Sequence, residues 1–264
     1  MIEQELVTRV GEAIDKDEVF AYYQPQYNNK TKKIVGAEAL MRLEDSECKI
    51  QSPASFIPIM EKSGLIYRAD IKMFEIVCKL LREQLDSNSP VVPISVNSSR
   101  VDMYDHDYIN DIEAIRKDYK IPVDLLRIEI TETSAGDYST ITEFLNDLHS
   151  HGYLVEMDDF GSGYSSLSML KDIPVDIIKL DMNFFRDELG EDMSERGQII
   201  VNSVIQMTKS LNTPVVAEGV ETTKQAEFVR DNGCHCVQGY YYSPPVTEGE
   251  FKEKLGTDKS LILK

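Results

Sequence analysis

The alternation of short apolar segments with helical segments constrains the fold most. Eight segments have the length and apolar character of buried strands, and they cover residues 21–28, 34–42, 92–97, 125–131, 154–160, 176–181, 214–220 and 234–242. Helical segments separate most of them. In residues 139–150, for example, Ile141, Phe144, Leu145 and Leu148 recur at helical spacing. Apolar strands that alternate with helices predict a sheet built mainly of parallel strands.

Eight such units in about 250 residues fit a (β/α)₈ barrel. Only residues 29–33 join the first two strands, which is too short for a crossover helix, so these strands should pair as an antiparallel hairpin. We therefore predict an α/β fold, a modified (β/α)₈ barrel with one antiparallel strand near the N-terminus. An open doubly wound sheet is the alternative. Residues 1–264 should form a single domain, and residues 1–18 an N-terminal helix that could be the stub of a linker from a longer parent chain.

The charge balance excludes some classes of partner. The net charge is −18, so the chain should not bind DNA or RNA through a basic surface, and a phosphate-containing ligand would need local cations. No apolar run approaches the roughly 20 residues of a membrane-spanning helix. The thiols are expected to be reduced, in a cytoplasmic protein, rather than to bind zinc or form disulfides; they belong to Cys48, Cys78, Cys234 and Cys236.

Polar residues stand near the carboxyl end of nearly every predicted strand, inside otherwise apolar sequence. They are Glu38, Asn97, Glu129, Glu132, Asp158, Asp159, Lys179, Asp181, Glu218, Glu221 and Gln238. In a (β/α)₈ barrel these strand ends converge on one mouth, where such enzymes carry out their chemistry. The sequence therefore predicts a carboxylate-rich site at that mouth.

Any one of these acids alone could be a solvated loop residue or a helix-capping partner. Together, at one mouth, they would repel each other strongly without cations. Carboxylates with one amide are ligands that suit hard divalent ions such as Mg²⁺ or Mn²⁺. The adjacent Asp158 and Asp159 can supply a bridging and a terminal ligand, which predicts a site for two metal ions about 3.5–4 Å apart.

The motifs resemble a known family, the EAL-domain cyclic-di-GMP phosphodiesterases. The resemblance rests on seven motifs in order: "EALMR" from Glu38, "SVN", "EITET", "DDFGSGYSSL", "IKLD", "VAEGVET" and "QGYY". Each is weak alone, but the ordered set is specific and covers almost the whole chain. The resemblance implies a barrel with one antiparallel strand, two Mg²⁺ or Mn²⁺ ions, and hydrolysis of the bacterial second messenger cyclic-di-GMP to linear pGpG.

The resemblance also assigns roles to residues. The implied metal ligands are Glu38, Asn97, Glu129, Asp158, Asp159 and Glu218. Lys179 matches the lysine that touches the nucleophilic water, Glu218 is a candidate proton acceptor, and Glu38 is expected to take part in catalysis. Substrate contacts are expected from Gln26, Leu40, Arg42, Asp70, Asp181, Glu221 and Gln238. Glu132 matches the residue that anchors the loop after Asp159, and a homodimer could form through that loop.

Two other functions compete with an active phosphodiesterase. The first is a catalytically silent cyclic-di-GMP receptor, since some relatives lack catalytic acids and only bind the nucleotide. The intact set of predicted ligands argues against it. The second is another metal-dependent barrel hydrolase that acts on a sugar or a small phosphate, which the order of the motifs makes improbable.

Overall fold

The chain folds around one curved sheet. The computed structural model describes residues 2–16, 18–44, 50–131, 138–161, 170–171, 173–182 and 194–257. Its strands are β1 (Val19–Asn28), β2 (Ile34–Glu44), β3 (Ile50–Gln51), β4 (Ile94–Asn97), β5 (Leu126–Thr131), β6 (Leu154–Phe160), β7 (Ile177–Asp181), β8 (Val215–Glu218) and β9 (Cys236–Val237). All but the short outer strand β3 belong to the eight segments that the sequence indicated.

The sheet closes into a barrel. The strand order is β1-β9-β8-β7-β6-β5-β4-β2-β3, and pairing between β1 and β2 closes the barrel, with β3 as an outer strand on β2. β1 is antiparallel to both β2 and β9, and β3 is antiparallel to β2, whereas each adjacent pair from β2–β4 around to β8–β9 is parallel. The prediction of a modified (β/α)₈ barrel with one antiparallel strand is confirmed, and the open-sheet alternative is wrong.

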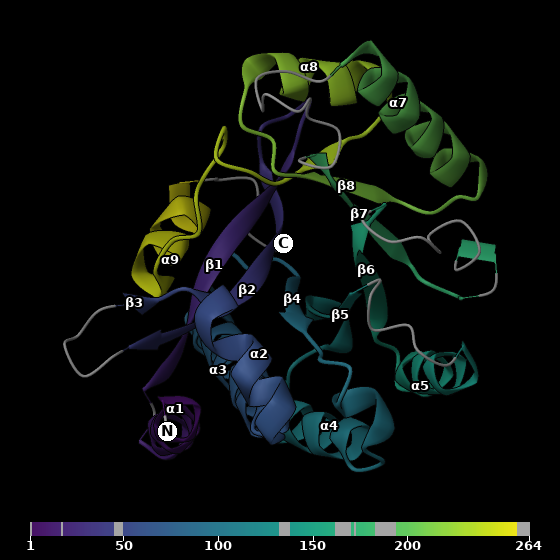
Figure 1. Ribbon diagram of the computed structural model, residues 1–264. Helices are drawn as coiled ribbons and strands as arrows, with labels where there is room; N and C mark the ends of the chain where they lie inside the picture. The colour runs from purple at the N-terminus through teal and green to yellow at the C-terminus, as the bar shows by residue number, and fades with distance from the viewer. Residues whose placement is uncertain are drawn as a thin grey trace.

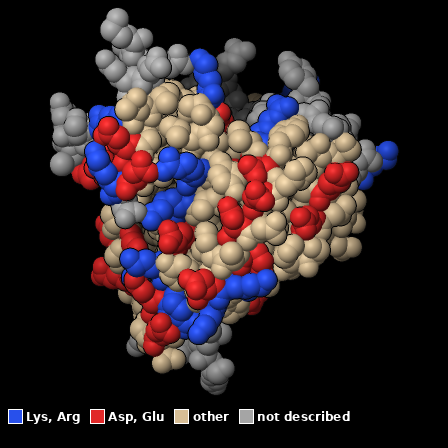
Figure 2. Space-filling model, turned by 90° about the horizontal axis from the view of Figure 1, so that it is seen from below, with Lys and Arg blue, Asp and Glu red and all other residues tan. Residues whose placement is uncertain are grey.

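Helices pack around the outside of the barrel (Figure 1). They are α1 (Ile2–Asp15), α2 (Pro53–Ser63), α3 (Ile66–Asp86), α4 (Tyr108–Asp118), α5 (Tyr138–Ser150), α7 (Glu195–Ser210), α8 (Thr223–Asp231) and α9 (Glu248–Thr257), with 3₁₀ turns η1 (Asp102–Tyr104) and η2 (Val123–Leu125). Among the residues described, no helix is both long enough and apolar enough to cross a membrane. On the face that Figure 2 shows, acidic and basic side chains are interspersed rather than gathered into one basic surface.

Local sequence explains where the helices beside the mouth begin. Thr222 precedes α8, and its side chain accepts a hydrogen bond from the Gln225 backbone N–H while the Gln225 side chain accepts from Thr222 N–H. This reciprocal capping box satisfies donors that a helix start leaves free. The Gln225 side chain also accepts from the backbone of Glu221, at 2.8 Å. The turn after β8 is thus held next to the strand end that carries Glu218.

The core explains why the strands read as nearly continuous apolar runs. Parallel strands covered by helices are buried on both faces, and Ile94, Ile128, Val155, Ile178 and Ala217 have no exposed surface. The exceptions inside this core are polar. Glu129, Glu156 and Lys179 are equally buried, and such groups require partners.

Candidate active site

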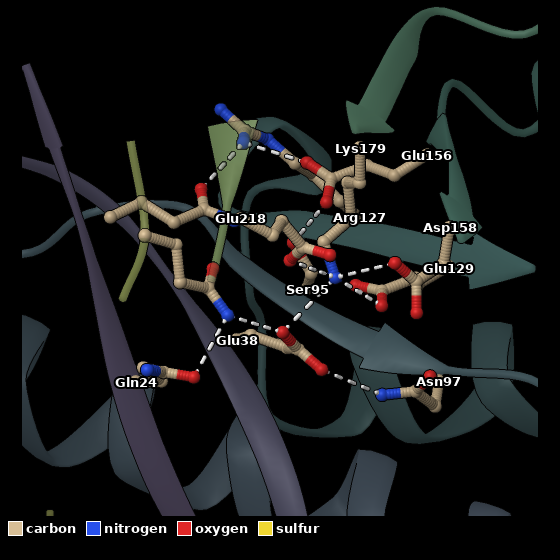
Figure 3. Close-up of polar contacts among 12 residues, drawn as sticks. Gln24, Glu38, Ser95, Asn97, Arg127, Glu129, Glu156, Asp158, Lys179 and Glu218 are labelled. Atoms are coloured by element: carbon tan, nitrogen blue, oxygen red, sulfur yellow. Dashed lines mark hydrogen bonds and ion pairs between the residues drawn. The ribbon is translucent and has the colours of Figure 1, made fainter. Parts of the chain in front are cut away.

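Four carboxylates surround one lysine at the carboxyl ends of the parallel strands (Figure 3). Lys179, on β7, has no exposed surface. Its Nζ lies 3.0 Å from Glu38 Oε2, 2.9 Å from Glu218 Oε1 and 3.4 Å from Asp158 Oδ1, and it also contacts Glu129 Oε1. These acids come from β2, β8, β6 and β5. Glu38 and Lys179, which contact each other directly in this cluster, lie 141 positions apart in the chain.

Barrel geometry brings these strand ends together. Asn97 is the last residue of β4 and pairs in register with Glu129 of β5. Its Nδ2 donates to Glu38 Oε1 at 3.3 Å. Glu218 ends β8 and pairs in register with Asp181, the last residue of β7. Asn97, Glu129 and Glu218 thus lie where the sequence predicted.

A β-bulge explains why two aspartates stand side by side. Met157 of β6 pairs with Ile178, but the next pair is Phe160 with Leu180, so β6 carries one extra residue at Asp158–Asp159. Asp159 has a φ of 56°, a left-handed conformation that aspartate tolerates better than most residues. Adjacent residues of a straight strand face opposite sides, and a bulge re-aims one of them. Both carboxylates can therefore serve the same mouth.

The electrostatics of the site show an excess of negative charge. Burial opposes a charged Lys179, but the four surrounding carboxylates outweigh it and raise its pKa well above the ordinary value. Burial and neighbouring acids raise the pKa of Glu129 and Glu218. Burial, followed by the charges of Asp158 and Asp181, raises the pKa of Asp159 to about 6. One ammonium does not neutralise this set of acids, which leaves the site able to accept more positive charge.

The donor set fits hard divalent cations in type and in charge. It offers carboxylate oxygens and the amide of Asn97, and Glu129 Oε2 is buried without a hydrogen-bond partner. In this structure the carboxylates point toward the Lys179 ammonium. Within the described ranges, no three His, Cys, Asp or Glu side chains are arranged to hold a metal ion. Binding a metal would thus require the carboxylates to turn from the ammonium toward the ion.

A cavity of about 290 Å³ opens beside the cluster. Glu38, Asn97 and Asp158 form the wall that it shares with the cluster, and it extends between β2, β4, α2 and α3 to Leu40 and Asp70. Leu40 and Asp70 were predicted to contact the substrate, and both line this cavity.

The register of β1 places Gln24, rather than the predicted Gln26, beside the ion cluster. Because β1 runs antiparallel to β2, Gln24 is opposite Glu38, and Gln26 is opposite Gly36, further from the mouth. Gln26 is buried and packs against Gly36, since a Cβ added to Gly36 would lie only 2.6 Å from Gln26 Oε1. Gln24 instead accepts a hydrogen bond at 3.1 Å from Gln238 Nε2, which also donates to Glu38 Oε2 at 2.6 Å. Gln24 and Gln238 thus lie beside Glu38, whereas Gln26 lies deeper in the barrel, where its Oε1 accepts a hydrogen bond from Arg127 Nη1 at 3.5 Å.

The remaining predicted residues lie at the rim or outside the described chain. Arg42, two residues beyond Leu40, stacks over the Tyr22 ring at 5.2 Å and donates to the Met41 carbonyl. Glu221 lies in the turn after β8. Glu132 and residues 162–169 of the loop after Asp159 are outside the described residues, so the anchoring and dimer predictions stay predictions.

The sequence interpretation missed a second polar layer below the cluster. Arg127 Nη1 lies 2.8 Å from Glu156 Oε1, and Ser95 Oγ donates to Glu156 Oε2 at 2.8 Å. Each precedes a residue of the site by two positions, in β5, β6 and β4. A residue two positions before a predicted ligand lies on the same face of the strand, so the charges of Arg127 and Glu156 could have predicted this second layer.

Comparison with known proteins identifies the family. The model of the EAL domain matches residues 8–245. The chain belongs to the EAL domain family. The match includes every residue of the ion cluster and both strands of the antiparallel hairpin. The carboxylates around Lys179 are thus part of an EAL domain.

Individual proteins resemble the chain over most of its length. Signaling protein YkoW of Bacillus subtilis is 34% identical over 253 residues, which cover 96% of this chain and 31% of that protein. Cyclic di-GMP phosphodiesterase PA2567 of Pseudomonas aeruginosa is 32% identical, covering 95% of this chain and 42% of that protein. The chain therefore spans less than half of these curated relatives. The solved PaMucR phosphodiesterase in complex with c-di-GMP is 29% identical with a TM-score of 0.85, over 94% of this chain and 99% of that one.

Proposed function

We propose that this chain hydrolyses cyclic-di-GMP to linear pGpG with the help of two divalent cations, Mg²⁺ or Mn²⁺. The observation that carries the proposal is the convergence of Glu38, Glu129, Asp158 and Glu218 on Lys179 at the barrel mouth, next to a cavity. Named phosphodiesterases among the relatives and a solved relative in complex with c-di-GMP support the choice of substrate.

The cations would be held by the six predicted ligands, Glu38, Asn97, Glu129, Asp158, Asp159 and Glu218. When bound, they supply Lewis acidity toward water and toward the phosphate oxygens. The chain's own groups do the rest. The surrounding acids keep Lys179 protonated. Its ammonium would donate a hydrogen bond to the attacking water and hold it in position. Glu218, 2.9 Å from that ammonium, would accept the proton that the water loses.

The surroundings of the mouth suit a nucleotide with two phosphodiesters. The cavity between Leu40 and Asp70 has apolar walls and a few polar groups, as small-molecule sites usually have. Arg42 stands at the rim on the same face of β2 as Glu38 and Leu40, and its guanidinium can grip a phosphate through paired donors. In a chain of net charge −18, such a local cation is needed to hold an anionic substrate.

A time course of purified protein with cyclic-di-GMP, with products separated by chromatography, tests the proposal. We expect pGpG to appear with Mg²⁺ or Mn²⁺ and turnover to stop in excess chelator. Ca²⁺ should support little reaction, because its longer bonds and looser geometry misplace the reacting groups. Full turnover in chelator would contradict the two-cation reading. Tight binding without turnover under any metal would instead show a silent receptor.

A further inference from the structure

A second group of buried acids lies in the wall of the cavity. Asp70, on α3, is 4% exposed, and Asp102, on η1, has no exposed surface. Asp70 lines the cavity together with Asn97 and Glu38. Neither acid belongs to the six predicted metal ligands. Two carboxyl groups buried together need a physical explanation, because each would oppose the charge of the other.

Hydrogen bonds from neighbouring groups explain only part of the burial of these two carboxyl groups. Ser99 N–H donates to Asp102 Oδ2 at 2.7 Å and more weakly to Asp70 Oδ2 at 3.3 Å. The Ser98 hydroxyl also reaches Asp102 Oδ2, at 3.3 Å. Asp102 Oδ1 is buried and has no hydrogen-bond donor when both carboxyl groups are ionised. An acceptor buried in this way should have a donor nearby.

One shared proton satisfies the pair. Burial, and then the charge of Asp102, raises the pKa of Asp70 well above its ordinary value, and the two side chains are within hydrogen-bonding contact. A protonated Asp70 donates to the Asp102 carboxylate and removes one of the two negative charges. Its proton is then committed to Asp102, so the capacity left to Asp70 on the cavity side is that of an acceptor.

We propose that Asp102 is a positioning residue that holds Asp70 as a fixed hydrogen-bond acceptor in the cavity wall. Held so, Asp70 favours a purine base whose edge presents N–H donors, as the N1–H and the 2-amino group of guanine do. The proposal rests on the proposed function, because it concerns the base of the same nucleotide. Asp102 itself acts through Asp70 and does not touch the ligand.

A purely local role for Asp102 is the competing explanation. Ser99 Oγ accepts weakly from Asp102 N–H at 3.4 Å while Asp102 Oδ2 accepts from Ser99 N–H, a reciprocal arrangement like a capping box. Such a cap uses Oδ2 alone and leaves both Oδ1 and the contact with Asp70 unexplained. The two roles separate in variants that keep the cap but differ in their reach to Asp70.

Two substitutions make that separation. In Asp102→Ser the hydroxyl can still cap the turn but is too short to hold Asp70. In Asp102→Asn the amide oxygen accepts from Ser99 N–H and the amide N–H₂ donates to Asp70, so positioning is retained. Glu113→Gln is a matched control, because Glu113 is a buried acid on α4 that pairs with Arg116 and does not line the cavity.

The measurement is the affinity of chelator-treated protein for cyclic-di-GMP and for its inosine analogue, which lacks the 2-amino groups, by calorimetry. We expect the wild type to prefer the guanine form. Asp102→Ser should weaken cyclic-di-GMP binding about tenfold, the cost of one good hydrogen bond to a buried acid, and bring the two affinities together. Asp102→Asn and Glu113→Gln should keep the preference. In turnover assays, Asp102→Ser should raise KM more than it lowers kcat.

Three outcomes would overturn the proposal: a wild type that does not distinguish the two bases, an Asp102→Ser variant that keeps the preference, or an Asp102→Asn variant that loses it as fully as serine does. The binding arms do not depend on catalysis. A wild type that prefers guanine but never produces pGpG would refute the proposed function and leave the assignment of Asp102 intact.

Discussion

Two polar layers lie one above the other inside the barrel, and they differ in charge balance. In the upper layer, at the mouth, four carboxylates surround the single ammonium of Lys179. In the lower layer Arg127 pairs with Glu156, and Ser95 donates to the other oxygen of Glu156. The layers share strands: Glu129 follows Arg127 by two residues, and Asp158 follows Glu156 by two. Figure 3 shows both groups together.

The difference separates a structural group from a reactive one. A buried ion pair with matched charges and satisfied oxygens holds its strands together, although replacing both partners can be nearly neutral. An unmatched cluster keeps acids charged in a buried place at a cost to folding, and such perturbed groups gather at functional sites. The excess negative charge at the mouth is therefore what bound metal cations would neutralise. The lower layer has little left to offer a ligand.

The largest effect should come from the upper layer. Glu218→Gln should lower kcat about a thousandfold, within the range for a group that transfers a proton. It should not destabilise the protein in chelator, since the raised pKa of Glu218 means that its charged form opposes folding at neutral pH. Turnover and thermal melting, measured side by side, check this. A variant that melts well below the wild type would place Glu218 with the structural groups.

The lower layer should respond in the opposite way. Arg127→Met should cost about 3 kcal/mol of the free energy of unfolding, because it leaves Glu156 buried without its partner. kcat should remain close to the wild-type value. Adding Glu156→Gln should recover much of the stability, because the unpaired charge is then gone. Denaturant melts of the single and double variants measure this, and a collapse of kcat with normal stability would erase the distinction between the layers.

Removal of the central cation should affect both properties. Lys179→Met should lower kcat about a hundredfold, the scale expected when one charge-stabilising donor is lost. In chelator it should also melt below the wild type, because four carboxylates then face each other without the ammonium. Mg²⁺ should restore more stability to the variant than to the wild type. An equal Mg²⁺ response in the two proteins would argue against charge excess as the property of this layer.

The smallest effect should come from Glu113, an acid outside the barrel interior that is paired with a cation, and it should depend on pH. Hydrogen bonding to Arg116 lowers the pKa of Glu113 from its ordinary 4.5 to about 2. A lowered pKa means that this carboxylate stabilises the fold above pH 4.5 and loses that contribution as the pH falls toward 2. Glu113→Gln should therefore melt slightly below the wild type at neutral pH, with the gap closing in acid. A gap that widens in acid would reverse the sign.

Much of the site followed from residue type and position along predicted strands. Asn97, Glu129, Asp158, Lys179 and Glu218 stand near strand ends, and a barrel brings such ends together whatever the packing details. Glu38 lies in the middle of β2, which continues to Glu44. The position of Gln24 could not be predicted, because Gln24 and Gln26 lie on the same face of β1 and only the antiparallel register with β2 shows that Gln24 reaches the level of Glu38. Asp102 carried no such signal, because its contact with Asp70 joins a 3₁₀ turn to a helix 32 positions away.

By itself, the sequence determined the barrel, its reversed first strand and the end of the barrel that carries the acids. Each depends on local pattern: apolar runs of strand length, a connection too short for a helix, and polar residues at strand ends. The tertiary structure alone decided which charges meet. Register set Gln24 against Glu38, a bulge re-aimed Asp159, and barrel closure put Lys179 among four carboxylates and Arg127 beside Glu156. Charge interactions depend on distances of a few ångströms, and those arise only when strands remote in the chain are packed side by side.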